Sequence, residues 1–335
     1  MRITSDMLHQ LARQTVNQRL RSEPDLLAAY LVGSLLGEQP LLGGTTDIDL
    51  VLVHKYQISV DREIIPLTPQ ISLDITHKIK DEYEPHRGLR HNPWMGYPLT
   101  KNHILLYDTD HWLEFIQAGV SATFHRPDNV LARVKGQLKK SRELWFSLMQ
   151  EPPSDHLAWL ALYFFSLGQA AQALAGLIGA PLTTRRFISV FRERLGELSA
   201  PEEILLEFLS LLGISSELND QIQGWIDSIE GDFDRLAKYD PVPVHLHECR
   251  RSYYLNAMRY LANESHPQDC LWPLLRIWLD IQKVLQNHGE DQAEWDDVLN
   301  SLELSQAKAD DRLAELDHFI DQAEIFIESW ESLYG

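Results

Sequence analysis

The order of apolar and polar residues predicts a mixture of strands and helices in the amino-terminal part of the chain. Residues 28–32 are apolar and read as a buried strand, and residues 104–107 give another. Residues 71–79 largely alternate between apolar and polar, the period of a strand with one buried face, and residues 46–53 are apolar and β-branched apart from two aspartates. Residues 1–21 carry apolar side chains near helical spacing, so we expect a helix packed on a mixed sheet.

From residue 128 onward the apolar residues recur every three to four positions, which predicts helices without a further strand. The 335 residues are enough for two domains. We expect an α/β (α+β) domain with a mixed sheet over residues 1–125, followed by an all-α helical bundle over residues 126–335. Residues 156–178 are almost entirely apolar and are predicted to form the central helix of that bundle.

Three aspartates on the predicted strands are the candidate chemistry. Asp47 and Asp49 are two residues apart and therefore project from the same face of their strand. Asp74 is the lone acid on the polar side of the alternating strand. If the two strands lie side by side, about 4.8 Å apart, three carboxylates converge. Like charges so close need a positive partner, and Mg²⁺ prefers carboxylate oxygens, so we predict a magnesium site.

The turn before the acids is suited to phosphate. Gly33 and Ser34 follow the first buried strand and open a predicted helical turn. The missing Cβ of Gly33 lets a phosphate approach the backbone, and free N–H groups at a helix start favour an anion. We therefore predict that Gly33 and Ser34 contact phosphate.

These motifs together resemble a known family. Gly33-Ser34, a loop of twelve residues, Asp47-Ile48-Asp49 and a later strand bearing Asp74 are similar to the signature of the DNA polymerase β-like nucleotidyltransferase superfamily. The form GS…GE…TDIDL resembles most closely its small-molecule branch, the aminoglycoside nucleotidyltransferases. The likeness covers roughly the first 120 residues. Leu36 stands where relatives commonly carry arginine, so any contact made by that arginine is in doubt.

The resemblance implies transfer of a nucleoside monophosphate from an NTP, with ATP the expected nucleotide, to a hydroxyl group, with release of pyrophosphate. Asp47 and Asp49 would hold two Mg²⁺ ions, and Asp74 would complete the second site and assist deprotonation of the hydroxyl. Gly33 and Ser34 would cradle the departing phosphates. Lys139, in the basic helix that follows the first domain, would meet the triphosphate. Some relatives complete their site across a dimer, so a homodimer is open.

Charge and composition limit the kinds of acceptor that we expect. Thirty basic against 49 acidic residues give a net charge of −19, which repels polyanions, so nucleic acid is an unlikely partner. A small, cationic acceptor such as an aminoglycoside suits that charge. The amino terminus is polar and the most apolar stretch is interrupted by polar residues, so we expect no membrane association and a cytoplasmic protein. Cys249 and Cys270 do not predict a disulfide.

Other interpretations remain open from sequence. A protein adenylyltransferase would share the first domain and differ in its acceptor, and a non-catalytic nucleotide-binding or interaction module would keep the fold without turnover. A polynucleotide-tailing enzyme is least favoured, because the sequence has no basic stripe interleaved with aromatics. Residues 81–100, rich in Pro, Gly, His and Arg, read as a loop that either contacts substrate or merely connects. His245 to Cys249 is read as a turn of helix rather than a zinc site.

Overall fold

The computed structural model describes residues 3–37, 39–100, 103–214 and 219–335. The chain forms two compact units, each built from two stretches of sequence. The first unit comprises residues 1–129 and 243–257, and the second comprises residues 130–242 and 258–335. The sequence predicted a single boundary at residue 125, whereas here the division falls at residue 129 and residues 243–257 return to the first unit.

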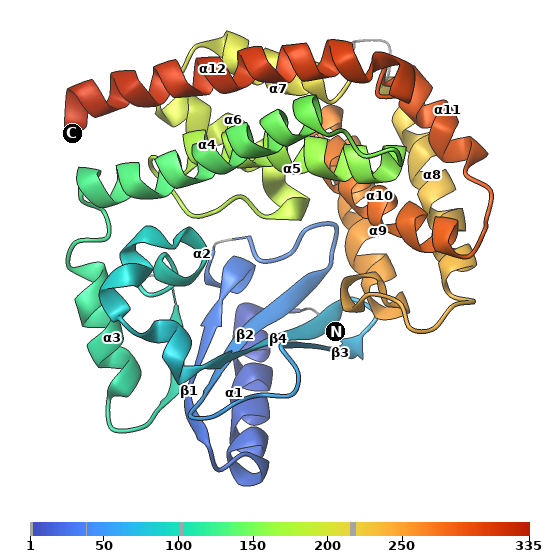
Figure 1. Cartoon of the computed structure of the whole chain (residues 1–335). Coiled ribbons are helices and arrows are strands. Elements are labelled where there is room, and N and C mark those ends of the chain that lie inside the picture. The colour runs from blue at the N-terminus through green and yellow to red at the C-terminus, as the bar shows by residue number, and fades with distance from the viewer. Residues whose placement is uncertain (1–2, 38, 101–102, 215–218) are drawn as a thin grey trace. The chain divides into compact units, whose positions relative to one another are not determined.

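A five-stranded sheet forms the centre of the first unit (Figure 1). The strand order is β3-β4-β2-β1-β5, and β2 and β4 are parallel while the other neighbours are antiparallel, so the predicted mixed sheet is confirmed. The edge strand β3 was not predicted, because Pro66 and charged residues interrupt its pattern and it is largely exposed. The strands are β1 Leu26–Val32, β2 Thr46–His54, β3 Arg62–Thr68, β4 Ile71–Ile79 and β5 Ile104–Asp108.

Each face of the sheet has its own apolar core. Helix α1 (Ser5–Ser22) lies on one face, where Leu8 and Val16 are buried with Leu50 and Ile75. Its N-cap is Thr4, whose hydroxyl accepts a hydrogen bond from the Met7 amide. The opposite face carries the second core, to which α3 (Trp112–Ser121) contributes.

The segment predicted as a loop over residues 81–100 contributes Tyr83, Leu89 and Leu99 to that second core. It forms two 3₁₀ turns, Lys80–Tyr83 and His86–His91, and the single turn α2 (Pro93–Gly96). Tyr83 is fully buried, and its hydroxyl lies 2.7 Å from that of Tyr30. The segment therefore covers the sheet, and a substrate contact made by it stays a prediction.

The second unit is helical. Helix α5 is its most buried helix and packs against α6, α10 and α12, as expected for the centre of a bundle. Within the described residues α5 is also the helix that is long and apolar enough to cross a membrane, but 72% of its apolar window is buried in the structure, as in a core helix. The helices are α4 Pro127–Gln150, α5 His156–Ala175, α6 Phe187–Glu197, α7 Glu202–Leu211, α8 Asn219–Leu236, α9 Glu248–Ala262, α10 Leu271–Asn287, α11 Ala293–Ser301 and α12 Ala309–Tyr334.

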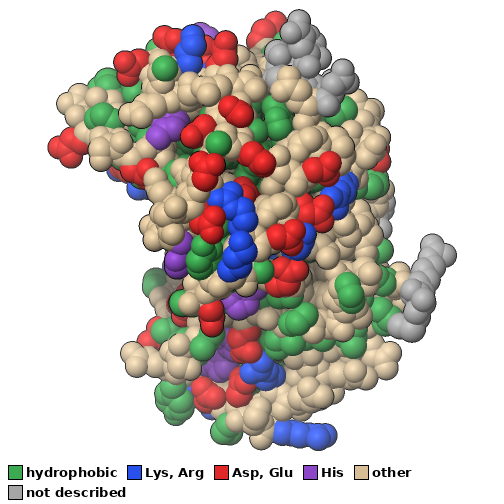
Figure 2. Space-filling model, turned by 90° about the vertical axis from the view of Figure 1, so that its right-hand side faces the viewer, with side chains coloured by type: hydrophobic (Ala, Val, Ile, Leu, Met, Phe, Trp, Pro, Cys, Tyr) green, Lys and Arg blue, Asp and Glu red, His purple; other side chains and the backbone are tan. Residues whose placement is uncertain are grey.

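Helix α9 begins in the first unit and ends in the second, because the division falls after Ala257. On the face drawn in Figure 2, basic side chains lie among acidic ones.

Candidate functional site

The three predicted aspartates lie together. β2 and β4 pair in parallel with Asp49 directly opposite Asp74 and Asp47 opposite Ser72. One carboxylate oxygen from each of Asp47, Asp49 and Asp74 lies within 4.8 Å of the others. The alternation of side chains along two neighbouring strands is thus enough to bring the acids to one patch.

The turn at Gly33 is built around one of these acids. Gly33 has φ +77° and opens the 3₁₀ turn Gly33–Leu36, directly after β1. A Cβ added to Gly33 would lie 1.9 Å from Oδ2 of Asp49. The missing side chain therefore makes room for the carboxylate, a requirement that the sequence interpretation had assigned to a phosphate. Ser34 lies beside it, with its hydroxyl 3.5 Å from that of Thr46.

An arginine from the edge strand binds Asp74. The Arg62 guanidinium donates from Nε to Oδ1 at 2.7 Å and from Nη2 to Oδ2 at 2.5 Å. These bonds raise the pKa of Arg62 above its ordinary value. Such a two-pronged pair is strong and fixes the carboxylate plane. Both oxygens of Asp74 are therefore engaged by Arg62.

A second arginine comes from the start of α9. Nη2 of Arg250 lies 3.2 Å from Oδ2 of Asp47 and 3.8 Å from Oδ2 of Asp74, and Nη1 donates to the Ser72 hydroxyl at 3.1 Å. The Arg250 side chain is only 3% exposed, and its guanidinium carbon lies 3.7 Å from the centre of the Tyr253 ring. Burial alone would lower the pKa of Arg250, but the surrounding tyrosines and carboxylates outweigh burial and raise it. Arg250 is thus a buried, charged partner of two acids.

Within the described residues, Asp49 is the acid that forms no ion pair with Arg62 or Arg250, although the charges of both act on it. Among the described residues no hydrogen bond to its carboxylate is found, and the pKa of Asp49 is raised well above its usual range by removal from water and by the charges of Asp47 and Asp74. Three ionised carboxylates against Arg62 and Arg250 leave one negative charge. A cation beside Asp49 would lower that pKa again.

The donor set therefore fits a divalent cation in part. Both oxygens of Asp49 and the oxygen of Asp47 that Arg250 does not contact are available as hard ligands. Asp74 differs from the sequence expectation, because Arg62 already binds both of its oxygens. Each carboxylate oxygen keeps a second lone pair, so Asp74 can still offer one to a cation, but its pairing with Arg62 makes it a weaker ligand and a weaker base.

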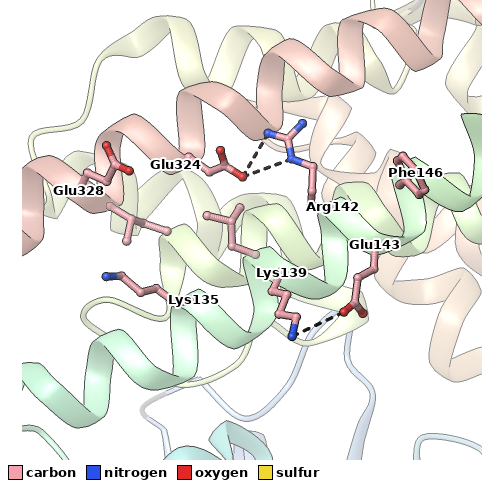
Figure 3. A pocket seen from close by; sticks show the side chains of 9 residues that line it. Lys135, Lys139, Arg142, Glu143, Phe146, Glu324 and Glu328 are labelled. Atoms are coloured by element: carbon pink, nitrogen blue, oxygen red, sulfur yellow. Dashed lines mark hydrogen bonds and ion pairs between the residues drawn. The ribbon is translucent and has the colours of Figure 1, made fainter.

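Lys139, the predicted triphosphate contact, lies in α4 of the second unit. Its side chain is 78% exposed and its Nζ lies 3.9 Å from a carboxylate oxygen of Glu143. It lines a pocket of about 540 Å³ between α4 and α12, where Arg142 also pairs with Glu324 (Figure 3). Lys139 belongs to the second unit and the three aspartates to the first, and a contact between Lys139 and a triphosphate at the aspartates stays a prediction. The pocket is lined by Lys135, Leu138, Lys139, Arg142, Glu143, Phe146, Glu324, Ile327 and Glu328.

Residues 245–249 were interpreted from sequence as a turn of helix rather than a zinc site. In the described part of the chain, groups of His, Cys, Asp or Glu close enough to share an ion are the three aspartates and a cluster of Glu23, His54 and His77. His245 lies in a 3₁₀ turn and Cys249 in the first turn of α9, so the prediction of a helical turn holds only in part. Cys249 and Cys270 are free thiols, as predicted.

Arg62 and Arg250 were missed by the sequence interpretation. The sequence did give one indication of them, because three carboxylates in one patch require positively charged partners. Tyr253 and Tyr254 follow Arg250 by three and four residues and lie on the same face of the helix. This spacing allows a cation–π contact between the guanidinium and a tyrosine ring.

Comparisons with known proteins do not assign this chain to a family. No family model matches the sequence, and no curated protein matches it. Among solved structures, one similar chain is a nucleotidyltransferase-like protein from Exiguobacterium sibiricum 255-15, which is 11% identical. The match covers 93% of this chain and 90% of that chain, with a TM-score of 0.28. At this TM-score the likeness carries no argument.

Proposed function

We propose that this protein is a metal-dependent nucleotidyltransferase. It transfers a nucleoside monophosphate from an NTP, with ATP expected, to a hydroxyl of a small acceptor and releases pyrophosphate. The observation that carries this proposal is the meeting of Asp47, Asp49 and Asp74 beside the Gly33 turn. That arrangement agrees with the motif resemblance in residue type, order and position.

In this reaction the acceptor oxygen attacks the α-phosphorus, a new O–P bond forms, and the bond to the bridging oxygen breaks as pyrophosphate leaves. Divalent cations, two by the resemblance, would neutralise the charge on the phosphates. Asp47 and Asp49 are the residues that would hold them, while Arg250 adds positive charge at Asp47. The amides at Gly33 and Ser34 would hold the departing phosphates. Asp74 would take the hydroxyl proton once Arg62 frees one oxygen.

The acceptor is proposed from charge. A net charge of −19 favours a small cationic acceptor, such as an aminoglycoside, over a polyanion. The pocket between α4 and α12 does not sharpen this choice, because its three basic residues balance its three acidic ones. A homodimer and a cytoplasmic location remain parts of the proposal.

The test is pyrophosphate release with each NTP and Mg²⁺ against a panel of aminoglycosides, with Asp49→Asn beside the wild type. Release that needs an acceptor and is lost in Asp49→Asn supports the proposal. Incubation of the protein with labelled ATP and cell lysate separates the small-molecule reaction from protein adenylylation, because only the latter labels a protein band.

A non-catalytic nucleotide-binding module is the second candidate, and the two arginines favour it. Arg62 and Arg250 neutralise Asp74 and Asp47 without any ion, as a fold that has lost turnover would require. Calorimetry distinguishes the two. NTP binding that is indifferent to Mg²⁺, with no pyrophosphate release from any acceptor, favours the binding module.

A further inference from the structure

A second cluster of ionisable residues lies on the other face of the same sheet. His54 ends β2 and His77 lies near the end of β4. Both fall on the face of Leu52 and Ile75, which belong to the core that α1 covers. From Asp49 to His54 the strand advances about 17 Å, so this cluster is separate from the three aspartates.

The two histidines face each other. Nε2 of His54 lies 2.9 Å from Nδ1 of His77, and their side chains are 5% and 7% exposed. The outer nitrogens face carboxylates, since Nε2 of His77 lies 2.7 Å from Glu63 and Nδ1 of His54 lies 3.6 Å from Asp25. Two imidazoles therefore stand between two acids.

The protons of the two imidazoles are used within the cluster. Two neutral imidazoles carry two N–H protons, which serve the hydrogen bonds from His77 to Glu63 and from His54 to His77. His54 then presents a lone pair toward Asp25, and at 3.6 Å this contact is longer than a hydrogen bond. A cation between the two inner nitrogens would instead leave an outer N–H group on each ring facing a carboxylate.

Glu23 supplies a third ligand. One of its carboxylate oxygens and one ring nitrogen of each histidine all lie within 4.8 Å of one another. Its Oε1 accepts a hydrogen bond from Arg19 at 2.8 Å, whereas its Oε2 is buried and has no hydrogen-bond partner. A buried carboxylate oxygen without a partner is costly, and it marks a position where a cation would be stabilised.

The charges around the histidines also call for a dication. Arg19 contributes one positive charge, and Glu23, Asp25 and Glu63 contribute three negative charges, which leaves −2 when both imidazoles are neutral. One divalent ion balances the group.

We propose that Glu23, His54 and His77 form a Zn²⁺ site in which water is the fourth ligand. Zinc binds imidazole nitrogen at about 2.0–2.1 Å, so two tetrahedral ligand nitrogens stand about 3.3 Å apart, and the present 2.9 Å needs to open by a few tenths of an ångström. With the ion between the inner nitrogens, both outer N–H groups donate to carboxylates, Glu63 and Asp25. That carboxylate–histidine–metal arrangement orients zinc ligands in general. The ion would join the end of α1 to β2 and β4.

The test uses Co²⁺ as a coloured substitute for zinc in the full-length protein stripped with a chelator. We expect one equivalent of Co²⁺ to give the visible absorption of a four-coordinate ion and to be displaced by one equivalent of Zn²⁺. Glu23→Gln keeps the side-chain shape and should weaken binding 10–100-fold, and His77→Gln should weaken it at least as much. His111→Gln removes a histidine that is 83% exposed and should change nothing.

Asp49→Asn should also leave the Co²⁺ spectrum unchanged, which separates this site from the proposed nucleotidyl-transfer site. Circular dichroism establishes that each variant is folded, and Glu23 at the cluster's rim, with 21% of its side chain exposed, is the variant least expected to unfold. The proposal is overturned if the wild type gives no such spectrum. It is also overturned if Glu23→Gln and His77→Gln bind Co²⁺ as tightly as the wild type, or if Asp49→Asn abolishes binding.

Discussion

At the residue scale, one glycine decides whether Asp49 can occupy its place. Any side chain at Gly33 meets the Asp49 carboxylate, and its φ of +77° is unfavourable for other residues. Gly44 offers a matched comparison, because its φ is +74° and a Cβ there would meet nothing within 4 Å. The backbone cost is therefore shared by both positions, and the collision is confined to Gly33.

We expect Gly44→Ala to lower the free energy of unfolding by about 1 kcal/mol and Gly33→Ala to lower it by more, about 2–3 kcal/mol, because the clash adds to the strain. Gly33→Ala should also weaken Mg²⁺ binding, since Asp49 must move. Urea unfolding and calorimetric Mg²⁺ titration measure both effects. Equal losses in the two variants would show that Asp49 does not depend on the space at Gly33.

Arg250 is the residue whose loss most directly reveals the charge balance of the site. Arg250→Met keeps most of the side-chain volume and leaves Asp47 without its buried partner. Breaking a buried ion pair costs about 3–5 kcal/mol, so the variant should unfold at much lower urea in the presence of EDTA. Mg²⁺ should restore more stability to Arg250→Met than it adds to the wild type, because a bound cation replaces the lost charge.

Lys135→Met is the control for that experiment, since Lys135 is half-exposed and pairs with Glu331 at the surface of the second unit. Its stability should change little and should not depend on Mg²⁺. If Arg250→Met gains no more from Mg²⁺ than this control does, the acids do not bind the ion.

At the element scale, the start of α5 combines a cap with a titratable group. Asp155 is the N-cap of α5, and its Oδ2 accepts from the Ala158 amide at 2.9 Å while Oδ1 accepts from Gln286 at 3.0 Å. Burial would raise the pKa of Asp155, but the hydrogen bonds from Gln286 and the helix amides outweigh it and lower the pKa. The ionised form is therefore the one that stabilises the folded state.

Because the folded-state pKa is lowered, this contribution is present above the unfolded pKa of about 3.9 and is lost as the pH falls through the lower, folded value. We expect Asp155→Ala to cost about 1 kcal/mol at pH 7, with the difference from wild type shrinking below about pH 4. Asp155→Asn keeps a cap that cannot ionise, so its difference from wild type at pH 7 should be smaller. Urea midpoints from pH 3 to 7 measure this, and a pH-independent Asp155→Ala deficit would contradict it.

The elements also show which parts of the fold the sequence determines locally. The alternation of apolar and polar residues predicted β4, and with it the position of Asp74, because a strand with one buried face has a two-residue period. The edge strand β3 was not predicted, because little of it is buried. A strand is recognised in a sequence by its alternation of buried apolar and exposed polar residues, and a mostly exposed strand lacks that alternation. The turn at Gly33 was predicted, but its neighbour Asp49 depends on strand pairing rather than on local sequence.

Long-range partners could not be predicted in the same way. The chain has 30 lysines and arginines, and no local pattern states that Arg62 and Arg250 are the ones that meet the acids. Arg250 is 203 residues from Asp47, and its position depends on residues 243–257 rejoining the first unit. Only tertiary contacts, which a single sequence does not display, select that arrangement.

At the scale of the whole molecule, the chain folds as two units, and helices α4 and α9 each begin in the first unit and end in the second. Arg250 contributes to the first unit, where it contacts Asp47 and Ser72. In the second unit the buried Asp232 accepts hydrogen bonds from Trp278 at 2.6 Å and from Gln282 at 2.5 Å. Each residue is therefore a probe confined to one unit.

We expect these two probes to act on different sets of amides in hydrogen exchange. Arg250→Met should speed exchange in β2 and β4 and in the first turns of α9, while α5 and α10 keep wild-type protection. Asp232→Ala leaves Trp278 and Gln282 without their buried acceptor and should speed exchange in α8 and α10 but not in β2 or β4. If either variant speeds exchange equally in both sets, the units unfold as one, and the charge balance at the acids is coupled to the stability of the helical bundle.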